Sequence, residues 1–566
     1  MRAALAFVIL VVGCSSAPPA APVAVAPAAP PVPVTHVITI VGTNDLHGAL
    51  ERLPLFGGFV ANIRAARAAD GGGVVLVDAG DLFQGTLESN LAEGADVVRA
   101  YNALGYTASA VGNHEFDYGP VGPDVTAKPG QDRRGALKAR AREAKFPLLV
   151  SNIIDQATGK RVDWPNMPAS TMVYVAGVSI GIVGASTEST PTTTMPANFA
   201  GLAMAPSTAD AIAAEATALR AKGAQLVIVV MHIGAECRNN EEPDDLSTCT
   251  KKDELFRVLD ALPKGLVDVA VAGHTHAPIA KRIDGIAVIE SLSSGRAFGR
   301  VDVRVTNGHV DDIRIHPPEL MCPLDAEHNA LPVASCHPAD YEGRPVVADA
   351  SLQKIADESI ARARGRSAEP LGLTLATPMR RAYRTESAEG DWFTDLMLAA
   401  QPRAQVALAN GGGLRADIAA GPLTYGELFM AMPFDNRFAL LTVRGSQLRS
   451  LVTANLASDA GIFSWGGLTA RVTCKRGAVD IAIRVAGKPL VDDLPYTIVT
   501  SDFIASGGDG VMARLQLPSD AIELTDVIIR DAMADVVRAH AGTLDPEAHY
   551  APKRLDYPGV RPVTCP

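Results

Sequence analysis

Residues 106–119 read YTASAVGNHEFDYG, and this stretch decides how the first half of the chain is interpreted. A short apolar run over 106–111 is followed by an amide, an imidazole and two carboxylates within five residues, 113–117. Two interpretations are open at this point: an ordinary polar loop that caps a strand, or half of an active site. The other strand ends of the chain distinguish between them.

The same pattern of a β-rich apolar run followed by a polar, glycine-bearing loop recurs through the first half. The other runs are VITIVG (37–42), VVLVD (74–78), PLLVSN (147–152), VSIGIVG (178–184), QLVIVVM (225–231) and VDVAVAG (267–273). Near-continuous apolar strands suit a sheet that is covered on both faces. Helical stretches such as TADAIAAEATALRAKG (208–223) alternate with the strands. We therefore predict an α/β domain over 36–315.

A second unit follows a Pro-rich connector. Residues 316–370 hold two cysteines and the helical pattern ASLQKIADESIARARG (350–365), and new strand and helix patterns then run from 371 to 554. None of the histidine motifs of the first half recurs there. We expect a separate α+β substrate-binding domain over 371–554, a tail over 555–566, and domain rotation about the helix 350–365.

The first residues predict export. MRAALAFVILVVGC (1–14) has one arginine, an apolar run too short to span a bilayer, and a glycine before Cys14. It resembles a bacterial lipoprotein signal peptide over 1–13, with a lipid on Cys14 anchoring the mature chain to the membrane. A plain secretory signal is the alternative. The uncharged Pro/Ala-rich segment 14–35 is typical of an extended tether.

Charge and cysteine content limit the partners and the compartment. The formal net charge of −11 offers no basic field for a long nucleic acid. Six cysteines besides Cys14 suit an oxidising compartment and allow fifteen pairings. Short separations favour Cys237 with Cys249 and Cys322 with Cys336, which leaves Cys474 with Cys565.

The polar residues at the strand ends share one chemistry. They are Asp45 and His47 in GTNDLHG, Asp81 in DAGDLFQG, Asn113 in GNHEFDYG, His232 in VMHIG, and His274 and His276 in AGHTH. A single such Asp is often a helix cap, but loops at the carboxyl ends of strands in α/β sheets converge on ligand sites. Carboxylate, amide and imidazole ligands suit Zn, Mn, Mg or Fe, and two such ions can clamp the oxygens of a displacement at phosphorus.

In this order the five motifs resemble the calcineurin-like metallophosphoesterases, whose domain is a layered α-β-β-α structure. With its second half, the chain resembles the bacterial 5′-nucleotidase and UDP-sugar hydrolase family. The resemblance implies two divalent metal ions, one held by Asp45, His47, Asp81 and His276, and one by Asp81, Asn113, His232 and His274. His276 stands where some close relatives have Gln. The resemblance further implies that His114 and Asp117 form a catalytic dyad, and it leaves Glu115 as a solvated or structural side chain.

The second half carries residues suited to a nucleotide. Arg380 and Arg384 lie four apart in PMRRAYRTE, and Arg415 follows three glycines; guanidinium groups are common readers of phosphate. The resemblance implies a nucleobase stacked between two phenylalanine rings, with polar contacts to base, ribose and phosphate. The residues concerned are Phe434, Phe503, Asn410, Asn436 and Asp509.

Together these features predict an exported two-metal phosphohydrolase that releases phosphate from nucleoside 5′-monophosphates, with UDP-sugars or cyclic nucleotides as further substrates. Two alternatives remain: a thiohydrolase of the sulfur-oxidation type, and a non-catalytic surface lipoprotein that binds nucleotides or a host ligand. The two phenylalanines favour a flat base over a sulfur carrier, and the intact set of ligands and dyad favours catalysis.

Overall fold

A computed structural model describes residue 13 and residues 35–122, 124, 127–324, 331–475 and 478–565. Apart from Gly13 and Thr35, the expected signal peptide (1–13), the lipidated Cys14 and the tether (14–35) lie outside the described residues. Among the residues that are described, no helix has the length and apolarity that a membrane crossing requires.

Two six-stranded sheets form the first half of the described chain. The first has the order β15 (His309–Leu320), β14 (Ala297–Thr306), β1 (Thr35–Thr43), β2 (Gly73–Asp78), β3 (Ala108–Ala110) and β4 (Leu148–Leu149). The second has the order β12 (Ile279–Ile283), β13 (Ile286–Glu290), β11 (Val269–Val271), β10 (Leu226–His232), β8 (Val178–Ser186) and β7 (Ser170–Val175). Strands β1 to β4 are parallel, as are β8, β10, β11 and β13.

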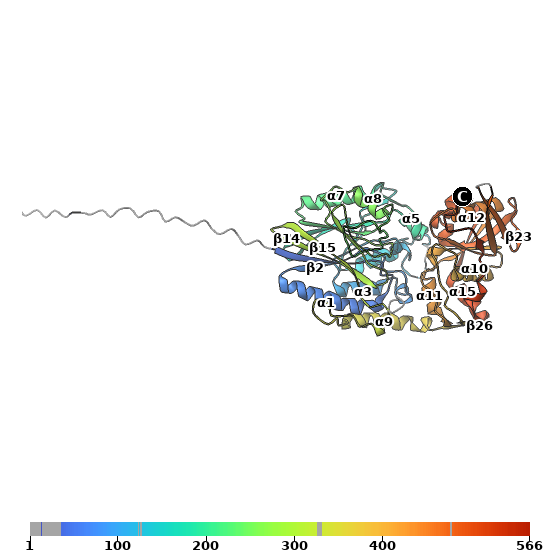
Figure 1. Ribbon diagram of the computed structural model, residues 1–566, viewed down its shortest axis with the longest axis horizontal. Coiled ribbons are helices and arrows are strands. Elements are labelled where there is room, and N and C mark those ends of the chain that lie inside the picture. Colours follow the sequence, from blue (N-terminus) through green and yellow to red (C-terminus); the bar gives the residue numbers. More distant parts are fainter. Residues whose placement is uncertain are drawn as a thin grey trace, which may run out of the picture. The chain divides into compact units, whose positions relative to one another are not determined.

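The sheets pack face to face and helices cover their outer faces. Ile40 and Val75 of the first sheet share a fully buried cluster with Ile180 and Ile228 of the second. Helices α1 (Leu53–Asp70) and α3 (Ala95–Leu104) cover the first sheet, and α7 (Thr208–Ala221) and α8 (Glu254–Asp260) cover the second, as Figure 1 shows. The expected α-β-β-α layering is confirmed, because apolar strands buried on both faces require a cover on each side.

The long helix α9 (Ala350–Ser367) connects the two halves. Asp349 caps its start by accepting the backbone N–H groups of Ser351 and Leu352. Figure 1 shows the helix running beside α1 and α3 toward α11 (Tyr425–Ala431), and it packs against all three.

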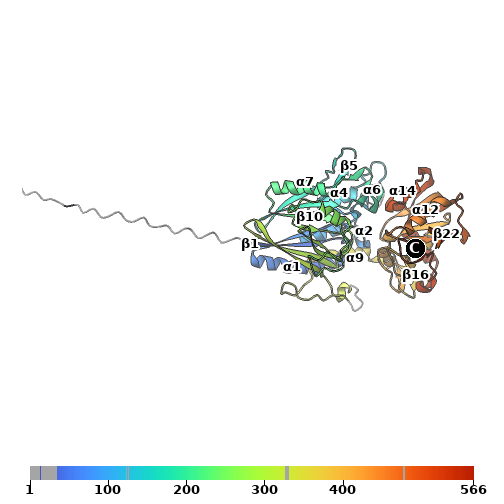
Figure 2. The same ribbon diagram turned by 45° about the horizontal axis from the view of Figure 1, so that its top comes forward.

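The second half is built on a mixed five-stranded sheet with the order β20 (Phe463–Gly466), β17 (Val406–Asn410), β24 (Pro495–Ser501), β19 (Arg437–Arg444) and β25 (Ile522–Ile528). A three-stranded sheet contains β18 (Gly421–Thr424), β16 (Pro370–Leu375) and β26 (Gly542–Leu544). A four-stranded sheet contains β23 (Lys488–Pro489), β22 (Ala478–Val485), β21 (Leu468–Lys475) and β27 (Leu555–Asp556). The main helices are α10 (Ala388–Ala400), α12 (Gly445–Leu456) and α15 (Ile529–Ala539). Figure 2 shows α12, β16 and β22 grouped apart from β1, α1 and β10, which fits a second α+β domain.

Three disulfides join Cys237 to Cys249, Cys322 to Cys336, and Cys474 to Cys565, which confirms the pairing favoured by the short separations.

Two strands of the first sheet are shorter than the apolar runs at 106–111 and 147–152 predicted. Only Ala108–Ala110 and Leu148–Leu149 form strands there. Tyr106, which precedes β3, stacks on Tyr101 with 3.9 Å between ring centroids.

Candidate metal and nucleotide site

The predicted ligands come together because each follows the carboxyl end of a parallel strand. Asp45 and His47 follow β1, Asp81 follows β2, Asn113 follows β3, His232 is the last residue of β10, and His274 and His276 follow β11. Parallel strands present their carboxyl ends at one edge of a sheet, and here the edges of the two packed sheets meet. The local apolar pattern therefore places residues more than two hundred positions apart around one point.

The donor atoms form two adjoining groups. Asp45, His47 and His276 make up one and Asp81, His232 and His274 the other, and within each group the donor atoms lie within 4.8 Å of one another. Between His47 and His276 the two Nε2 atoms are 3.1 Å apart. His232 Nε2 lies 3.0 Å from Asp81 Oδ2 and 3.0 Å from Asn113 Oδ1, which places the predicted amide ligand beside the second group.

The hydrogen bonds behind the imidazoles fit metal ligation. His47 Nδ1 lies 2.8 Å from the Gln84 carbonyl oxygen, and His232 Nδ1 lies 2.9 Å from the Ala79 carbonyl oxygen. A carbonyl accepts only from a protonated Nδ1, so in the neutral ring the Nε2 lone pair faces the group. Asp45 Oδ1 is buried without a hydrogen bond of ordinary geometry among the described residues, and it faces His276 Nε2 at 3.2 Å. An uncompensated carboxylate oxygen facing imidazole nitrogens fits a divalent cation.

The electrostatics of the second group also call for positive charge. Burial disfavours a charged His232, but the adjacent Asp81 and Asp45 carboxylates outweigh burial and raise the pKa of His232 to about 10. Burial, together with His232, lowers the pKa of His274 to about 3. Buried carboxylates thus favour a cation at this point, while the second imidazole remains a neutral ligand.

The ligand loops have a strained backbone. Five of the seven predicted ligands adopt a positive φ that side chains rarely tolerate: Asp45 (51°), His47 (50°), Asp81 (58°), His274 (82°) and His276 (58°). Gly112 lies so close to Asp81 that any larger residue would clash there, because an added Cβ would lie 2.1 Å from Asp81 Oδ1. Such strain persists where the surrounding contacts enforce it, and it is concentrated at functional sites.

His114 and Asp117 form the expected pair. His114 Nδ1 lies 2.5 Å from Asp117 Oδ2, and the other carboxylate oxygen accepts the Thr194 hydroxyl at 2.9 Å and the Met195 N–H at 3.3 Å. Burial disfavours a charged His114, but Asp117 and Asp81 outweigh it and raise the pKa of the imidazole. The ring therefore favours its protonated form, with Nε2 free to donate.

Glu115 differs from one of the two expectations. It is 1% exposed and therefore not a solvated side chain. Its carboxylate accepts three backbone N–H groups, from Asp81, Leu82 and Gly112. The structural interpretation is correct, because only such internal donors stabilise a carboxylate away from water.

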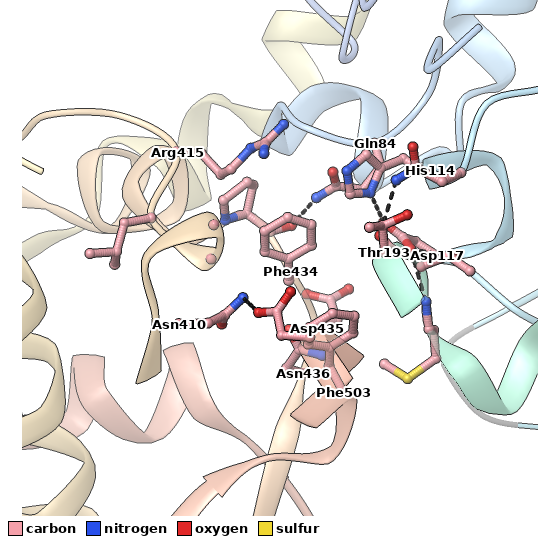
Figure 3. Close-up of a pocket in the computed structure, with 18 of the residues that line it drawn as sticks. Gln84, His114, Asp117, Thr193, Asn410, Arg415, Phe434, Asp435, Asn436 and Phe503 are labelled. Atoms are coloured by element: carbon pink, nitrogen blue, oxygen red, sulfur yellow. Dashed lines mark hydrogen bonds and ion pairs between the residues drawn. The ribbon is translucent and has the colours of Figure 1, made fainter. Parts of the chain in front are cut away.

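A cavity of about 1230 Å³ extends from this site into the second half of the chain. Figure 3 shows Phe434 between His114 and Arg415. The His114 and Phe434 ring centroids are 5.6 Å apart, and the Arg415 guanidinium carbon lies 5.9 Å from the Phe434 centroid. Phe503 lines the same cavity, and Asn410 donates to Asp509 at 2.7 Å. Asn436 also lines it and donates to Asp502 at 3.0 Å.

The two predicted arginines of PMRRAYRTE lie in different environments. Arg380 is not among the lining residues; its side chain is 76% exposed and pairs with Asp417 at 3.2 Å. Arg384 lines the cavity and pairs with Glu236 at 3.5 Å. Asp45, His47 and His232 are buried beneath the lining residues.

Many of the lining residues had no sequence prediction, among them one arginine, one tyrosine and one glutamine. Arg381 lines the cavity and donates to the Leu414 carbonyl at 3.3 Å, Tyr383 lies over the Gly411–Gly413 turn, and Gln84 donates to the Pro433 carbonyl at 2.9 Å. Two consecutive arginines carry no signal that says which one faces inward. A third aromatic beside the glycine turn was visible in the sequence and could have been considered.

Comparison with known families finds two matching domains. Residues 38–278 match the calcineurin-like phosphoesterase model, and residues 364–515 match the 5′-nucleotidase C-terminal domain model. The first match contains all seven predicted ligands and the dyad. The second contains every predicted substrate-binding residue.

Individual relatives share this arrangement over most of their length. The chain is 25% identical to Protein UshA of Yersinia enterocolitica, covering 86% of this chain and 88% of that one. It is 25% identical to a 5′-nucleotidase of Vibrio cholerae, covering 90% and 93%. Its fold resembles the crystal structure of a 5′-nucleotidase precursor from Thermus thermophilus, with a TM-score of 0.69 and 22% identity, covering 92% of this chain and 99% of that one.

Proposed function

Because the chain belongs to the family that joins a calcineurin-like phosphoesterase domain to a 5′-nucleotidase C-terminal domain, we propose that it is a metal-dependent 5′-nucleotidase. It releases phosphate from nucleoside 5′-monophosphates, and UDP-sugars or cyclic nucleotides are further substrates. One contact between the two halves of the chain carries the proposal. The ring centroid of His114, in the first half, lies 5.6 Å from that of Phe434, in the second. A phosphate at the dyad is thereby within reach of a base at the aromatic wall.

The donor set defines the cofactor that we propose. Asp45, His47 and His276 would hold one divalent ion and Asp81, His232 and His274 the other, with Asn113 completing the second and Asp81 shared between them. Zn, Mn and Mg all suit these ligands. When bound, the ions supply Lewis-acid stabilisation of the phosphoryl oxygens and an activated water.

The dyad supplies the proton. Asp117 occupies Nδ1 of His114, so the Nε2 proton points into the cavity and can be donated to the leaving ribose oxygen. Thr194 and Met195 hold Asp117 in place. Arg415 contributes a fixed positive charge beside His47, where the phosphate charge increases during reaction.

The second half selects the nucleotide. We propose that Phe434 and Phe503 hold the base, that Asn410, Asn436 and Asp509 contact the base and ribose, and that Arg381, Arg384 and Arg415 contact phosphate. The proposal replaces Arg380 with its neighbour, since Arg381 lines the cavity while Arg380 pairs with Asp417 outside it.

The chain is further proposed to be exported and anchored by a lipid on Cys14. We propose the following organisation: signal 1–13, tether 14–35, phosphoesterase domain 36–315, connector 316–370, nucleotide domain 371–554 and tail 555–566. The thiohydrolase and the non-catalytic binding protein are not favoured, because the relatives named above are UshA and 5′-nucleotidase proteins, six of the seven proposed ligands form two groups, and Asn113 lies beside His232.

Phosphate release from AMP, UDP-glucose and p-nitrophenyl phosphate tests the proposal. The purified full-length protein is stripped with a chelator and then supplied with Mn, Zn or Mg. Metal-dependent turnover of AMP well above the generic ester is expected. Turnover of the generic ester alone would contradict the nucleotide, and no turnover with any metal would favour the binding-protein alternative.

A further inference from the structure

A carboxylate that belongs to neither metal group connects the loops that carry the ligands. Glu115 lies in the short 3-10 helix His114–Phe116, directly after the Asn113 ligand. One of its oxygens, Oε2, accepts Asp81 N–H at 2.9 Å and Gly112 N–H at 2.6 Å, and Oε1 accepts Leu82 N–H at 2.7 Å. Two loops from neighbouring strands therefore converge on one buried side chain.

The strained conformation of Asp81 explains why such an acceptor is needed. The positive φ of 58° at Asp81 directs two consecutive N–H groups, from Asp81 and Leu82, toward the same point. Consecutive N–H groups in this arrangement form a concave anion-binding nest. Without an acceptor both donors would be buried and unpaired, and the strained backbone would lose the contact that holds it.

The same contacts determine the position of the dyad. Asp81 Oδ1 accepts the His114 N–H at 2.9 Å, so the carboxylate of the second metal group is hydrogen-bonded to the backbone of the residue that carries the catalytic imidazole. We propose that Glu115 is a positioning residue that sets the Asp81 carboxylate and the Asn113–His114 turn at their working separation. The kinetic part of this inference rests on the proposed function and the affinity part on the proposed metal sites, whereas the exchange part rests on neither.

The chemistry of the donors predicts which substitution is harmful. In Glu115→Gln one oxygen becomes an NH₂ group, and because both oxygens of Glu115 accept backbone N–H groups, the NH₂ would face a donor at either position. Asp78 is a matched control, an equally buried acid at the end of β2. Its Oδ2 accepts the hydroxyls of Thr43 and Tyr101, at 2.6 and 2.9 Å, and its Oδ1 accepts Gly80 N–H. Hydroxyls can turn and accept from an amide, so Asp78→Asn preserves its contacts.

Two measurements without substrate test the inference directly. In the metal-free protein, hydrogen exchange of the peptide spanning residues 79–84 is expected to be faster in E115Q than in the wild type and unchanged in D78N. Titration with Mn²⁺ or Zn²⁺ is expected to show a loss of affinity of about 10- to 100-fold in E115Q, the range for residues that orient metal ligands. Unchanged exchange or affinity within twofold of wild type would overturn the inference. Equal losses in D78N would also overturn it, because burial alone would then explain them.

Kinetics provide the third readout. E115Q is expected to lower kcat for AMP at saturating metal while KM changes less than twofold, because the base contacts are remote from it. If E115Q does not fold, E115D is the second variant; it keeps the carboxyl group but withdraws it by one carbon, and metal affinity within twofold of wild type would contradict the proposal. A wild-type protein that hydrolyses no phosphoester, yet shows the exchange and affinity differences, would refute the proposed function and leave the positioning role intact.

Discussion

Arg415 Nη2 lies 3.3 Å from His47 Nε2, although the two residues are 368 positions apart in the chain. Burial lowers the pKa of His47 well below its usual value, and the Arg415 charge lowers it further, so the imidazole stays neutral beside the guanidinium. A partly buried arginine placed next to a cluster of metal ligands is matched to an anion that both contact. This relationship joins the phosphoesterase site to the nucleotide half.

Replacing Arg415 with Ala is expected to lower kcat/KM by about 100-fold, the cost of removing one donor to developing charge. The loss should be similar for AMP and p-nitrophenyl phosphate, because both present a phosphate. Steady-state kinetics with the two substrates measure it. Arg403→Ala, which removes a surface arginine paired with Glu523, is the control and should leave both rates within twofold. A loss of activity confined to AMP would indicate that Arg415 contacts the nucleoside and not the phosphate.

Phe503→Ala is expected to raise KM for AMP about tenfold, since stacking of a base on an aromatic ring contributes on the order of 1–3 kcal/mol. KM for p-nitrophenyl phosphate and both kcat values should change little. Gly508→Ala offers an independent test, because its added Cβ would lie 2.4 Å from the Phe503 ring and displace it. Equal effects of Phe503→Ala on the two substrates would argue against base stacking.

Asp81→Asn is expected to abolish turnover, with kcat reduced by at least about 1000-fold. The amide cannot balance the charge of a bound cation, and the side chain is shared between the two proposed metal sites. Metal content by elemental analysis should fall from two ions toward one or none. Asp163→Asn, whose carboxylate is 97% exposed, should keep full activity and metal content. Retention of two ions in D81N would contradict the shared role.

Thr194→Val removes the hydroxyl that donates to Asp117 at 2.9 Å. Because Asp117 orients His114, kcat is expected to fall roughly threefold to tenfold with KM unchanged, consistent with loss of one hydrogen bond of about 1 kcal/mol. Thr192→Val removes a nearby exposed hydroxyl that donates to the Ser189 carbonyl, and should have no effect. A rise in KM without a change in kcat would assign Thr194 to substrate binding.

Asp302→Asn tests an acid-sensitive contact far from the site. Burial opposes the charge of Asp302, but hydrogen bonds from His316, Arg300 and Thr39 outweigh it and hold its folded-state pKa well below the usual value. A depressed pKa adds stability that is present above the unfolded-state pKa of about 3.9 and is lost as pH falls toward the folded-state value. The thermal midpoint of D302N should therefore lie below that of wild type at pH 7. The difference between the two proteins should shrink progressively below about pH 4. A difference independent of pH would exclude the carboxylate charge as its cause.

The sequence by itself was enough to predict the layering of the first domain and to propose the set of metal ligands. Apolar runs of strand length, each followed by Asp, Asn or His, are local patterns, and parallel strands bring their carboxyl ends together wherever they lie in the chain. The disulfide pairs could be predicted for a similar reason, since Cys237–Cys249 and Cys322–Cys336 close short loops.

Only the tertiary structure decided which of two consecutive arginines faces the cavity, that Glu115 is buried, and that Arg415 reaches His47. Arg380 and Arg381 lie in an irregular segment without periodicity, so nothing local assigns one of them to the cavity. The environment of Glu115 depends on two N–H groups from another loop, and the Arg415 contact depends on how the halves pack. Burial and long-range donors are properties of the assembled fold, because they arise from residues that the local sequence does not contain.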